Sequence, residues 1–331
     1  MAYVASDLLV LRALAGDARA IARLLTRAEN GGAESRPALD EMFRRAGRAH
    51  IVGITGVPGS GKSTLVALLA AAIRASGRTV AIVAIDPSSP FSGGAILGDR
   101  VRMGELGGDS GVFVRSMATR GALGGLARGT LEAVDVLDAA GFDVVMIETV
   151  GVGQDEVDVA RAAHTTVVVS SPGLGDDIQA IKAGILEIAD IHVVSKCDRA
   201  DADRTIADLK NMLTLGIGTA RVGGQAAPGR MPAATQVAWR PPIVATSAAR
   251  GEGVGELAAA IDAHRVALEQ SGEMAARRAM TNERRLLKAG EEILRERFAR
   301  SLHGRLAGLL DERARRTTSP HSAALRLIAE R

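Results

Sequence analysis

Residues 56–64 place a lysine and three hydroxyl side chains among closely spaced glycines. The segment fits the pattern G-x-x-x-x-G-K-[ST], in which glycines let backbone N–H groups turn inward around phosphate oxygens. In such a loop the lysine reaches the β- and γ-phosphates and the next hydroxyl ligates Mg²⁺. The segment therefore predicts a site for a magnesium-bound nucleoside triphosphate, made by Gly56, Val57, Pro58, Gly59, Ser60, Gly61, Lys62, Ser63 and Thr64.

The flanking residues give this pattern its structural context. Ile51–Thr55 is a β-branched run typical of a strand, and Leu65–Ile73 is a helix-forming run. A helix that begins directly after the loop would aim its N-terminal dipole at the phosphates. These flanks favour a phosphate-binding loop over a glycine-rich turn that happens to carry lysine and serine.

Acidic residues close two further apolar runs, at Asp86 and Glu148. Mg²⁺ prefers hard oxygen ligands, commonly one or two carboxylates together with phosphates and waters. A single acid at a strand end is often a helix N-cap, but two of them in order after a phosphate loop favour a metal site. With Asp99 as a third acidic candidate, the predicted metal ligands are Ser63, Asp86, Asp99 and Glu148.

The glycines at 151 and 153 follow Glu148 directly. They are typical of a backbone that approaches the γ-phosphate and moves when that phosphate leaves. Gln154 would then orient the attacking water, as a glutamine does in some GTPases, or it lies on the surface. Lys62, Glu148 and Gln154 are thus the catalytic candidates.

The choice of base rests on Ser195-Lys196-Cys197-Asp198, which resembles the N-K-x-D element of GTPases. There the aspartate accepts hydrogen bonds from the N1–H and N2-amine of guanine, and adenine would leave it unpaired at a cost of roughly 1–3 kcal/mol. Serine in place of asparagine would remove one neutral hydrogen bond, about 0.5–1.5 kcal/mol. Ser247 and Ala248 follow a later strand and resemble the Ser-Ala loop that GTPases place against the base. GTP is therefore favoured over ATP.

Apolar strand-like runs alternate with helical patterns between residues 49 and 268, which indicates an α/β fold with a mostly parallel sheet covered by helices on both faces. Ligands of such sheets bind at the carboxyl ends of the strands, where the motifs above lie. We predict a P-loop NTPase domain with strands at Ile51–Thr55, Thr79–Asp86, Val112–Ser116, Phe142–Glu148, Thr165–Ser170, Ile191–Ser195 and Ile243–Thr246.

Helical extensions are expected on both sides of this domain, at residues 1–48 and 269–331. In the N-terminal extension, Gly31-Gly32 and Pro37 are expected to break the chain. The Gly- and Pro-rich residues 215–242 predict a long loop. The C-terminal extension carries an apolar stripe that predicts packing on another helix or a second subunit: Leu287, Leu294, Phe298, Leu302, Leu306 and Leu309.

Composition narrows the class of protein. With 47% hydrophobic but 2% aromatic residues among 331, the core must be built from Ala, Val, Leu and Ile. No apolar run is long enough to span a membrane, no leader-like segment is evident, and the single Cys197 permits no internal disulfide, so we expect a cytoplasmic protein. The residues from Ser271 onward hold 14 basic and 8 acidic side chains, which fits a solvated helix face better than nucleic-acid binding.

Several of these segments together resemble the MeaB/ArgK family of P-loop GTPases, over about residues 5 to 300. The resemblance is carried by the phosphate loop, by His264 and by five further motifs: Asp86–Pro90, Gly93–Met103, Glu148–Gln154, Pro172–Asp190 and Trp239–Pro242. It implies a chaperone that couples GTP binding and hydrolysis to cofactor loading, protection or reactivation of an adenosylcobalamin-dependent acyl-CoA mutase.

The resemblance also implies roles for residues that the motifs alone do not assign. Asp176, Gln179 and Lys182 would form a switch that relays the nucleotide state to the mutase, and the C-terminal helices would join a homodimer. The chain departs from the family at Ser195, where asparagine is usual, and at Asp177, where a longer acid is usual. Because of these departures, two kinds of partner stay open: methylmalonyl-CoA mutase, or a related isobutyryl- or hydroxyisobutyryl-CoA mutase.

Two other functions fit the same phosphate loop. A P-loop kinase would transfer phosphate to a small molecule or a protein, and an interaction protein would hold its nucleotide as a static ligand. Phosphate transfer to an acceptor would identify the first, and function without the lysine of the loop would identify the second.

Overall fold

The computed structural model describes residues 6–86, 108–118, 128–149, 155–173, 188–220, 239–302 and 319–329. The chain divides into two compact units, Met1–Arg278 and Ala279–Arg331. The first unit contains the sheet and every site residue that the structure describes.

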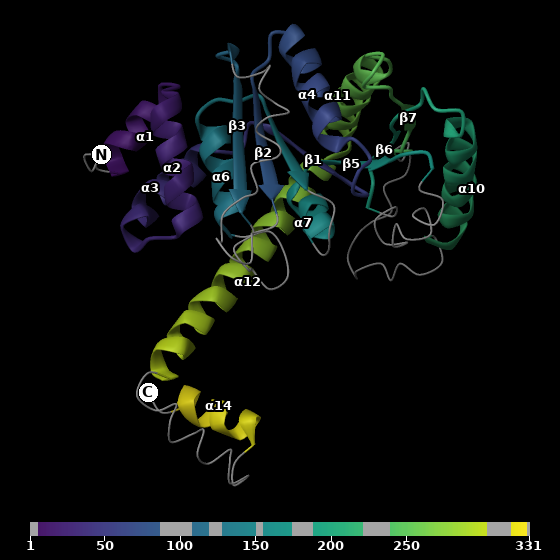
Figure 1. Cartoon of the computed structure of the whole chain (residues 1–331). Helices are drawn as coiled ribbons and strands as arrows, with labels where there is room; N and C mark the ends of the chain where they lie inside the picture. The colour runs from purple at the N-terminus through teal and green to yellow at the C-terminus, as the bar shows by residue number, and fades with distance from the viewer. Residues whose placement is uncertain are drawn as a thin grey trace. The chain divides into compact units, whose positions relative to one another are not determined.

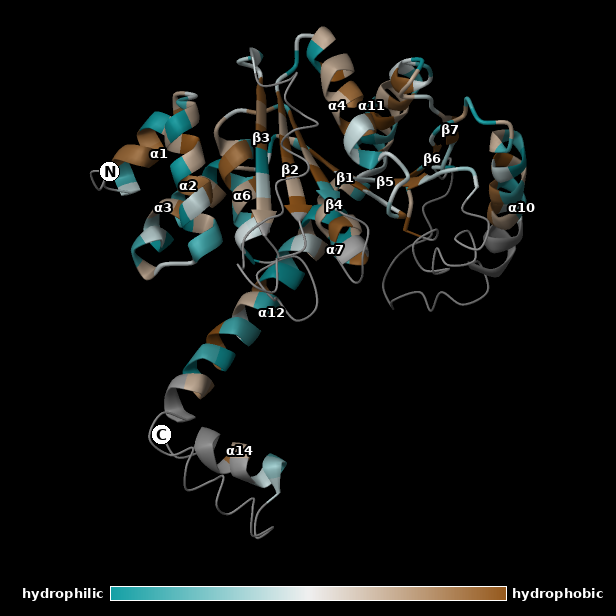
Figure 2. Ribbon diagram, in the orientation of Figure 1, coloured by the Kyte–Doolittle hydropathy of each residue, from teal (hydrophilic) through white to brown (hydrophobic). Residues whose placement is uncertain are grey.

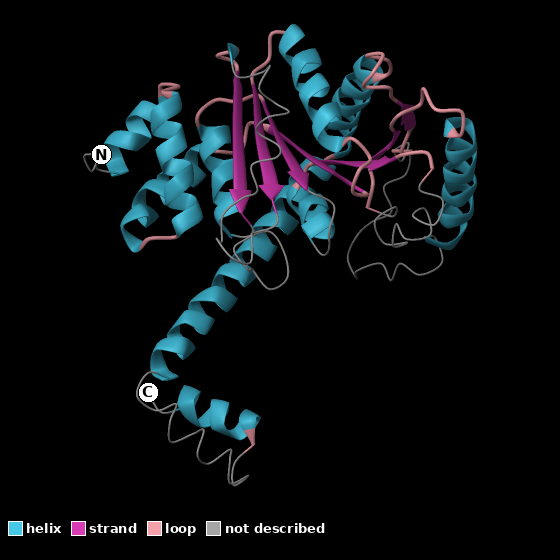
Figure 3. Ribbon diagram, in the orientation of Figure 1, coloured by secondary structure: helices cyan, strands magenta, loops and turns pink. Residues whose placement is uncertain are grey.

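A single seven-stranded sheet forms the centre of the first unit, with the order β3-β2-β4-β1-β5-β6-β7. Every strand pairs with its neighbours in parallel, and Figure 3 shows the strands in magenta between helices. The predicted α/β fold is confirmed, and each predicted strand overlaps an observed one: β1 (His50–Gly56), β2 (Val80–Asp86), β3 (Val112–Ala118), β4 (Val144–Thr149), β5 (Thr165–Ser170), β6 (Ile191–Val194) and β7 (Ile243–Ala245).

Helices cover both faces of this sheet (Figure 1). Alternate residues of the strands pack to opposite sides, so that Ile51 and Val145 join one apolar cluster while Val52 and Met146 join the other. The first cluster includes α6 (Arg128–Ala139) and α7 (Asp155–Ala162), and the second includes α4 (Lys62–Ala75) and α11 (Val254–Ser271). Burial on both faces explains why the central strands are apolar at nearly every position, as the brown strands in Figure 2 show.

Three N-terminal helices pack outside α6: α1 (Ser6–Leu14), α2 (Ala18–Asn30) and α3 (Arg36–Arg45), with the short 3-10 helix η1 (Ala33–Ser35) between the last two. Gly31 ends α2 in a left-handed conformation with φ 67°, as a C-cap glycine does. Pro37, expected to break the chain, instead lies in the first turn of α3, where its missing N–H costs no helical hydrogen bond.

The predicted loop at 215–242 is wrong at its start, because α10 (Ala202–Ala220) continues through Gly216 and Gly218. An apolar stripe holds this helix against β6 and β7, and it includes Leu209 and Ile206. That packing outweighs the cost of about 1 kcal/mol for each helical glycine. The remainder of the predicted loop to residue 238 lies outside the described residues.

The C-terminal region contains α12 (Glu273–Leu302), which begins in the first unit, and α14 (Pro320–Ala329). Large apolar side chains of α12 are exposed, among them Leu286 at 74%, Leu287 at 61% and Leu294 at 61%. Within the described residues, the helices are all too short or too polar to cross a membrane.

Candidate functional site

The phosphate loop lies between the end of β1 and the start of α4. Gly56 closes β1 with φ 139°, and a Cβ at this position would stand 2.0 Å from the carbonyl oxygen of Val169 on β5. Glycine is thus needed here both for the backbone angle and for the close approach of the two strands. Gly61 has φ 86° and directly precedes α4, so the loop delivers the helix N-terminus to the carboxyl edge of the sheet.

Lys62 is buried at the first position of α4. Its ammonium donates to the carbonyl oxygens of Gly56 at 2.7 Å and Val57 at 2.9 Å. The lysine is therefore held against the loop, and phosphate oxygens would offer it charged acceptors in place of neutral ones.

Ser63 and Glu148 meet across the sheet edge. The Ser63 hydroxyl donates to Glu148 Oε1 at 2.7 Å, and Glu148 is buried near the end of β4, the strand beside β1. Hydroxyl and carboxylate oxygens are the ligands that Mg²⁺ prefers, so this pair fits a magnesium ion next to the phosphates.

Asp86 ends β2 on the other side of β4, where Ala84 is paired with Glu148. The sheet thus brings the backbone of this third predicted ligand to the same edge as the first two. Asp99 and Gln154 lie outside the described residues, as do Asp176, Gln179 and Lys182.

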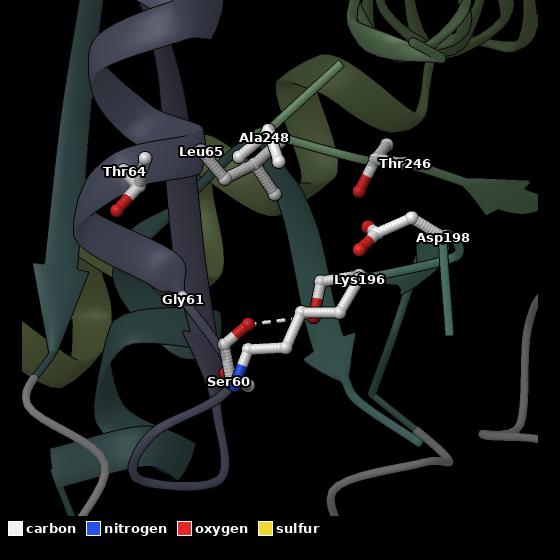
Figure 4. A pocket seen from close by; sticks show the side chains of 10 residues that line it. Ser60, Gly61, Thr64, Leu65, Lys196, Asp198, Thr246 and Ala248 are labelled. Carbon is white, nitrogen blue, oxygen red and sulfur yellow. Dashed lines mark hydrogen bonds between the residues drawn. The ribbon is translucent and has the colours of Figure 1, made fainter. Parts of the chain in front are cut away.

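A cavity of about 210 Å³ opens beside the loop, with Thr64 and Leu65 of α4 on one side and Asp198 and Thr246 on the other (Figure 4). Its remaining lining comes from the loop, from the predicted base-binding segments and from the next residue along the chain: Ser60, Gly61, Ser195, Lys196, Ala248 and Ala249. The structure therefore gathers the predicted phosphate and base elements around one cavity at the carboxyl edge of the sheet, as expected for this fold.

Asp198 faces this cavity as a carboxylate. Ser247 donates to Asp198 Oδ1 at 2.6 Å, and this hydrogen bond is the main cause that holds the pKa of Asp198 below its ordinary value. A carboxylate in this position accepts hydrogen bonds and suits the N–H groups of guanine.

The sequence motifs did not predict the close contacts between the base segment, Ser195–Asp198, and the phosphate loop. Lys196 adopts a left-handed conformation with φ 53°, and its ammonium donates to the carbonyl oxygen of Gly59 at 2.7 Å. Ser195 donates to the carbonyl oxygen of Ser60 at 2.6 Å, the bond drawn as a dashed line in Figure 4. Motif spacing indicates which residues face a ligand, but not that they also bind each other.

A partly buried polar network lies at the opposite, amino edge of the sheet. Arg277 of α12 binds both carboxylate oxygens of Asp190, at 2.7 and 2.8 Å, while the Trp239 indole donates to the Asp190 carbonyl. His264 packs against the Trp239 ring with centroids 4.8 Å apart and shares a 2.8 Å hydrogen bond with Thr165. Residues of the Pro172–Asp190 and Trp239–Pro242 signatures thus serve here to join β5, β6, α11 and α12.

The fold and the site together define a P-loop GTPase. The chain matches the family of the methylmalonyl Co-A mutase-associated GTPase MeaB over residues 21–302, and it belongs to that family.

Individual relatives support this assignment. A Pyrococcus abyssi protein named as a GTPase is 43% identical over 325 residues, covering 98% of this chain and 96% of the relative. The GTPase ArgK of Escherichia coli is 35% identical over 262 residues, covering 79% of this chain and 75% of ArgK. Among solved structures, a LAO/AO transport system kinase aligns with a TM-score of 0.66 at 25% identity, over 100% of this chain and 98% of that one.

Proposed function

We propose that this GTPase is a chaperone of an adenosylcobalamin-dependent acyl-CoA mutase, and that it couples GTP binding and hydrolysis to loading, protection or reactivation of the mutase. The observation that carries the proposal is the family match, which extends from the N-terminal helices through the nucleotide site to the end of α12. The matched range includes both the residues that we assign to nucleotide binding and those that we assign to the partner.

Hydrolysis would begin with GTP seated between the phosphate loop and the cavity beside it. Lys62 would turn from the carbonyls of Gly56 and Val57 to the β- and γ-phosphates, and the backbone amides of the loop would hold the phosphate oxygens. Mg²⁺, held by Ser63 and Glu148 together with Asp86 and Asp99, would offset negative charge on the phosphates. We assign Gln154 to orienting the water for in-line attack, so that positioning and electrostatics carry the reaction.

The contact between Ser63 and Glu148 supports a switching role. Ser63 donates to Glu148 at 2.7 Å, and the same two side chains are the proposed metal ligands. Arrival of a magnesium-bound nucleotide would therefore rearrange the end of β4 and the segment that follows it. Asp176, Gln179 and Lys182 would relay this change to the mutase.

A homodimer is the proposed assembly. Leu286, Leu287, Ile293 and Leu294 of α12 are between 46% and 74% exposed. An apolar surface of this kind is commonly covered by another helix, and a second copy of the chain supplies one.

The proposal is tested by measuring phosphate release from GTP with and without methylmalonyl-CoA mutase, together with capture of the mutase in GTP, GDP and no nucleotide. We expect slow hydrolysis that rises when the mutase is added, and capture that depends on the nucleotide. Hydrolysis that is unchanged by every candidate mutase would contradict the proposal. Phosphate transferred to an acceptor would instead identify a kinase, and a Lys62→Ala variant that still supports the mutase would identify a static nucleotide.

A further inference from the structure

The first residue of the base segment, Ser195, is buried with 6% of its surface exposed. Its hydroxyl lies 2.6 Å from the carbonyl oxygen of Ser60 in the phosphate loop and 2.9 Å from the carbonyl oxygen of Ser170 at the end of β5. Both neighbours are acceptors, and a hydroxyl has a single hydrogen to donate. That hydrogen is therefore used within the protein.

This arrangement bears on which edge of a purine the site can recognise. N7 of a purine is a hydrogen-bond acceptor, so a side chain that reads it must supply a hydrogen. Ser195 has no further hydrogen to donate to N7. Asp198, in contrast, faces the cavity as an acceptor and is held there by Ser247, which suits the N1–H and N2-amine donors of guanine.

The residue that directly follows β7 bears on the same question. Val194 of β6 is paired with Ala245 of β7, so Ser195 and Thr246 directly follow the ends of adjacent strands. The Thr246 hydroxyl is buried and has no hydrogen-bond partner among the described residues. The Ser195 hydroxyl thus bonds to the phosphate loop even though the buried Thr246 hydroxyl follows the adjacent strand.

We propose that Ser195 is a positioning residue for the phosphate loop and not a contact to the base, so that the protein recognises guanine at Asp198 and does not sense N7. Ser195 would hold the Ser60 peptide, and Lys196 the Gly59 peptide, in the shape that binds phosphate. The proposal concerns the nucleotide site of the GTPase and is independent of the mutase partnership.

Three ligands separate the two roles when their affinities are measured by calorimetry in the presence of magnesium. GDP presents base and phosphates, 7-deaza-GDP lacks the N7 acceptor, and pyrophosphate lacks the base. We expect the wild-type protein to bind GDP and 7-deaza-GDP within about twofold of each other. Ser195→Ala should weaken GDP and pyrophosphate by a similar factor, about two- to tenfold, because one neutral hydrogen bond to the loop is lost.

Ser247→Ala is the matched control, since it also removes one hydroxyl, and that hydroxyl donates to Asp198. It should weaken GDP binding and leave pyrophosphate binding unchanged. Ser195→Asn supplies an amide with two hydrogens, and it should create a preference of about threefold or more for GDP over 7-deaza-GDP. This variant and the wild-type comparison decide the matter if Ser195→Ala does not fold.

Two results would overturn the proposal. One is a wild-type protein that prefers GDP over 7-deaza-GDP by more than about fivefold. The other is pyrophosphate affinity that does not change in a folded Ser195→Ala protein, whatever happens to GDP. A wild-type protein that binds no guanine nucleotide would contradict GTP binding itself, which is a different failure.

Discussion

At the scale of single residues, the side chains of the phosphate loop that we propose to bind the nucleotide form hydrogen bonds within the protein. Lys62 donates to two loop carbonyls, and Ser63 donates to Glu148. Each contact is one that phosphate or magnesium would replace with a more highly charged partner. The loop is therefore held by the same side-chain atoms that we propose to contact the ligand.

Replacing Lys62 tests the charge that this residue brings to the reaction. We expect Lys62→Ala to lower kcat for GTP hydrolysis by about 100-fold or more, because a positioned charge that stabilises the transition state is lost. Lys210→Ala, which removes an exposed lysine of α10, serves as the control and should keep wild-type kcat. Equal rates for the two variants in single-turnover assays would show that Lys62 has no catalytic role.

At the scale of elements, the junction of β1, the loop and α4 depends on the absence of a side chain at Gly56. A Cβ there would overlap the carbonyl oxygen of Val169 at 2.0 Å, so β1 and β5 approach each other only with glycine in place. This contact lies directly beneath the phosphate loop. Strand pairing and the proposed phosphate site thus depend on the same residue.

We predict that Gly56→Ala lowers the free energy of unfolding by roughly 3 kcal/mol or more, through backbone strain and overlap combined. Gly77→Ala is its matched control, because Gly77 also has a positive φ, 83°, but a Cβ there meets nothing within 4 Å. Gly77→Ala should lower the free energy of unfolding by about 1–2 kcal/mol, from backbone strain alone. Chemical denaturation measures both, and similar losses would mean that the overlap with β5 is relieved by small shifts.

At the scale of the whole molecule, the first unit encloses histidines that must stay neutral. His50 and His164 stack with ring centroids 6.1 Å apart, and burial is the main cause that lowers the pKa of each to about 3. An unfolded histidine takes up a proton near pH 6.5. Between these values the unfolded chain binds more protons than the folded one, so stability must fall with falling pH.

We therefore predict that the free energy of unfolding decreases as the pH is lowered from about 6.5 toward 4, by up to about 1.4 kcal/mol per pH unit for each such histidine. His164→Asn should flatten this dependence, while His321→Asn on α14, an exposed site, should leave it unchanged. Urea denaturation at a series of pH values gives the slopes. A His164→Asn protein with the same slope as the wild type would show that this ring is protonated without cost.

The second unit carries the prediction on assembly. If a second copy covers α12, Leu287→Asp with Leu294→Asp should convert a dimer to a monomer, because charged side chains would replace exposed leucines. Leu11→Asp on α1, where the leucine is 66% exposed, is the control and should remain dimeric. Sedimentation measures the states, and a wild-type monomer at micromolar concentration would contradict the proposed homodimer.

Much of this fold could be predicted because its strongest signals are local. The central strands β1, β4 and β5 are buried on both faces and are apolar at most positions, so they appear as apolar runs in the sequence. The edge strand β3 is only half-buried, and its apolar run Val112–Val114 is shorter. The phosphate loop is equally local, since its glycines and Lys62 are adjacent in the chain. The Ser195–Asp198 segment was found for the same reason.

The remainder depends on contacts between distant residues. Pro37 lies in the first turn of a helix, α3, that packs against α6. Similarly, α10 passes through two glycines because its apolar stripe packs on the sheet. The bond from Ser195 to Ser60 joins residues 135 positions apart, and the Asp190–Arg277 pair joins residues 87 apart. Spacing within a motif carries no information about such partners.

The shortness of β6 has a consequence for how this chain can change over evolution. Its four residues separate Asp190, which binds Arg277, from Ser195, which binds the phosphate loop. Inserting or deleting one residue would turn every following side chain to the opposite face of the sheet, and no loop intervenes to absorb the shift. Substitutions can accumulate in this strand, but its length should stay fixed in every functional descendant.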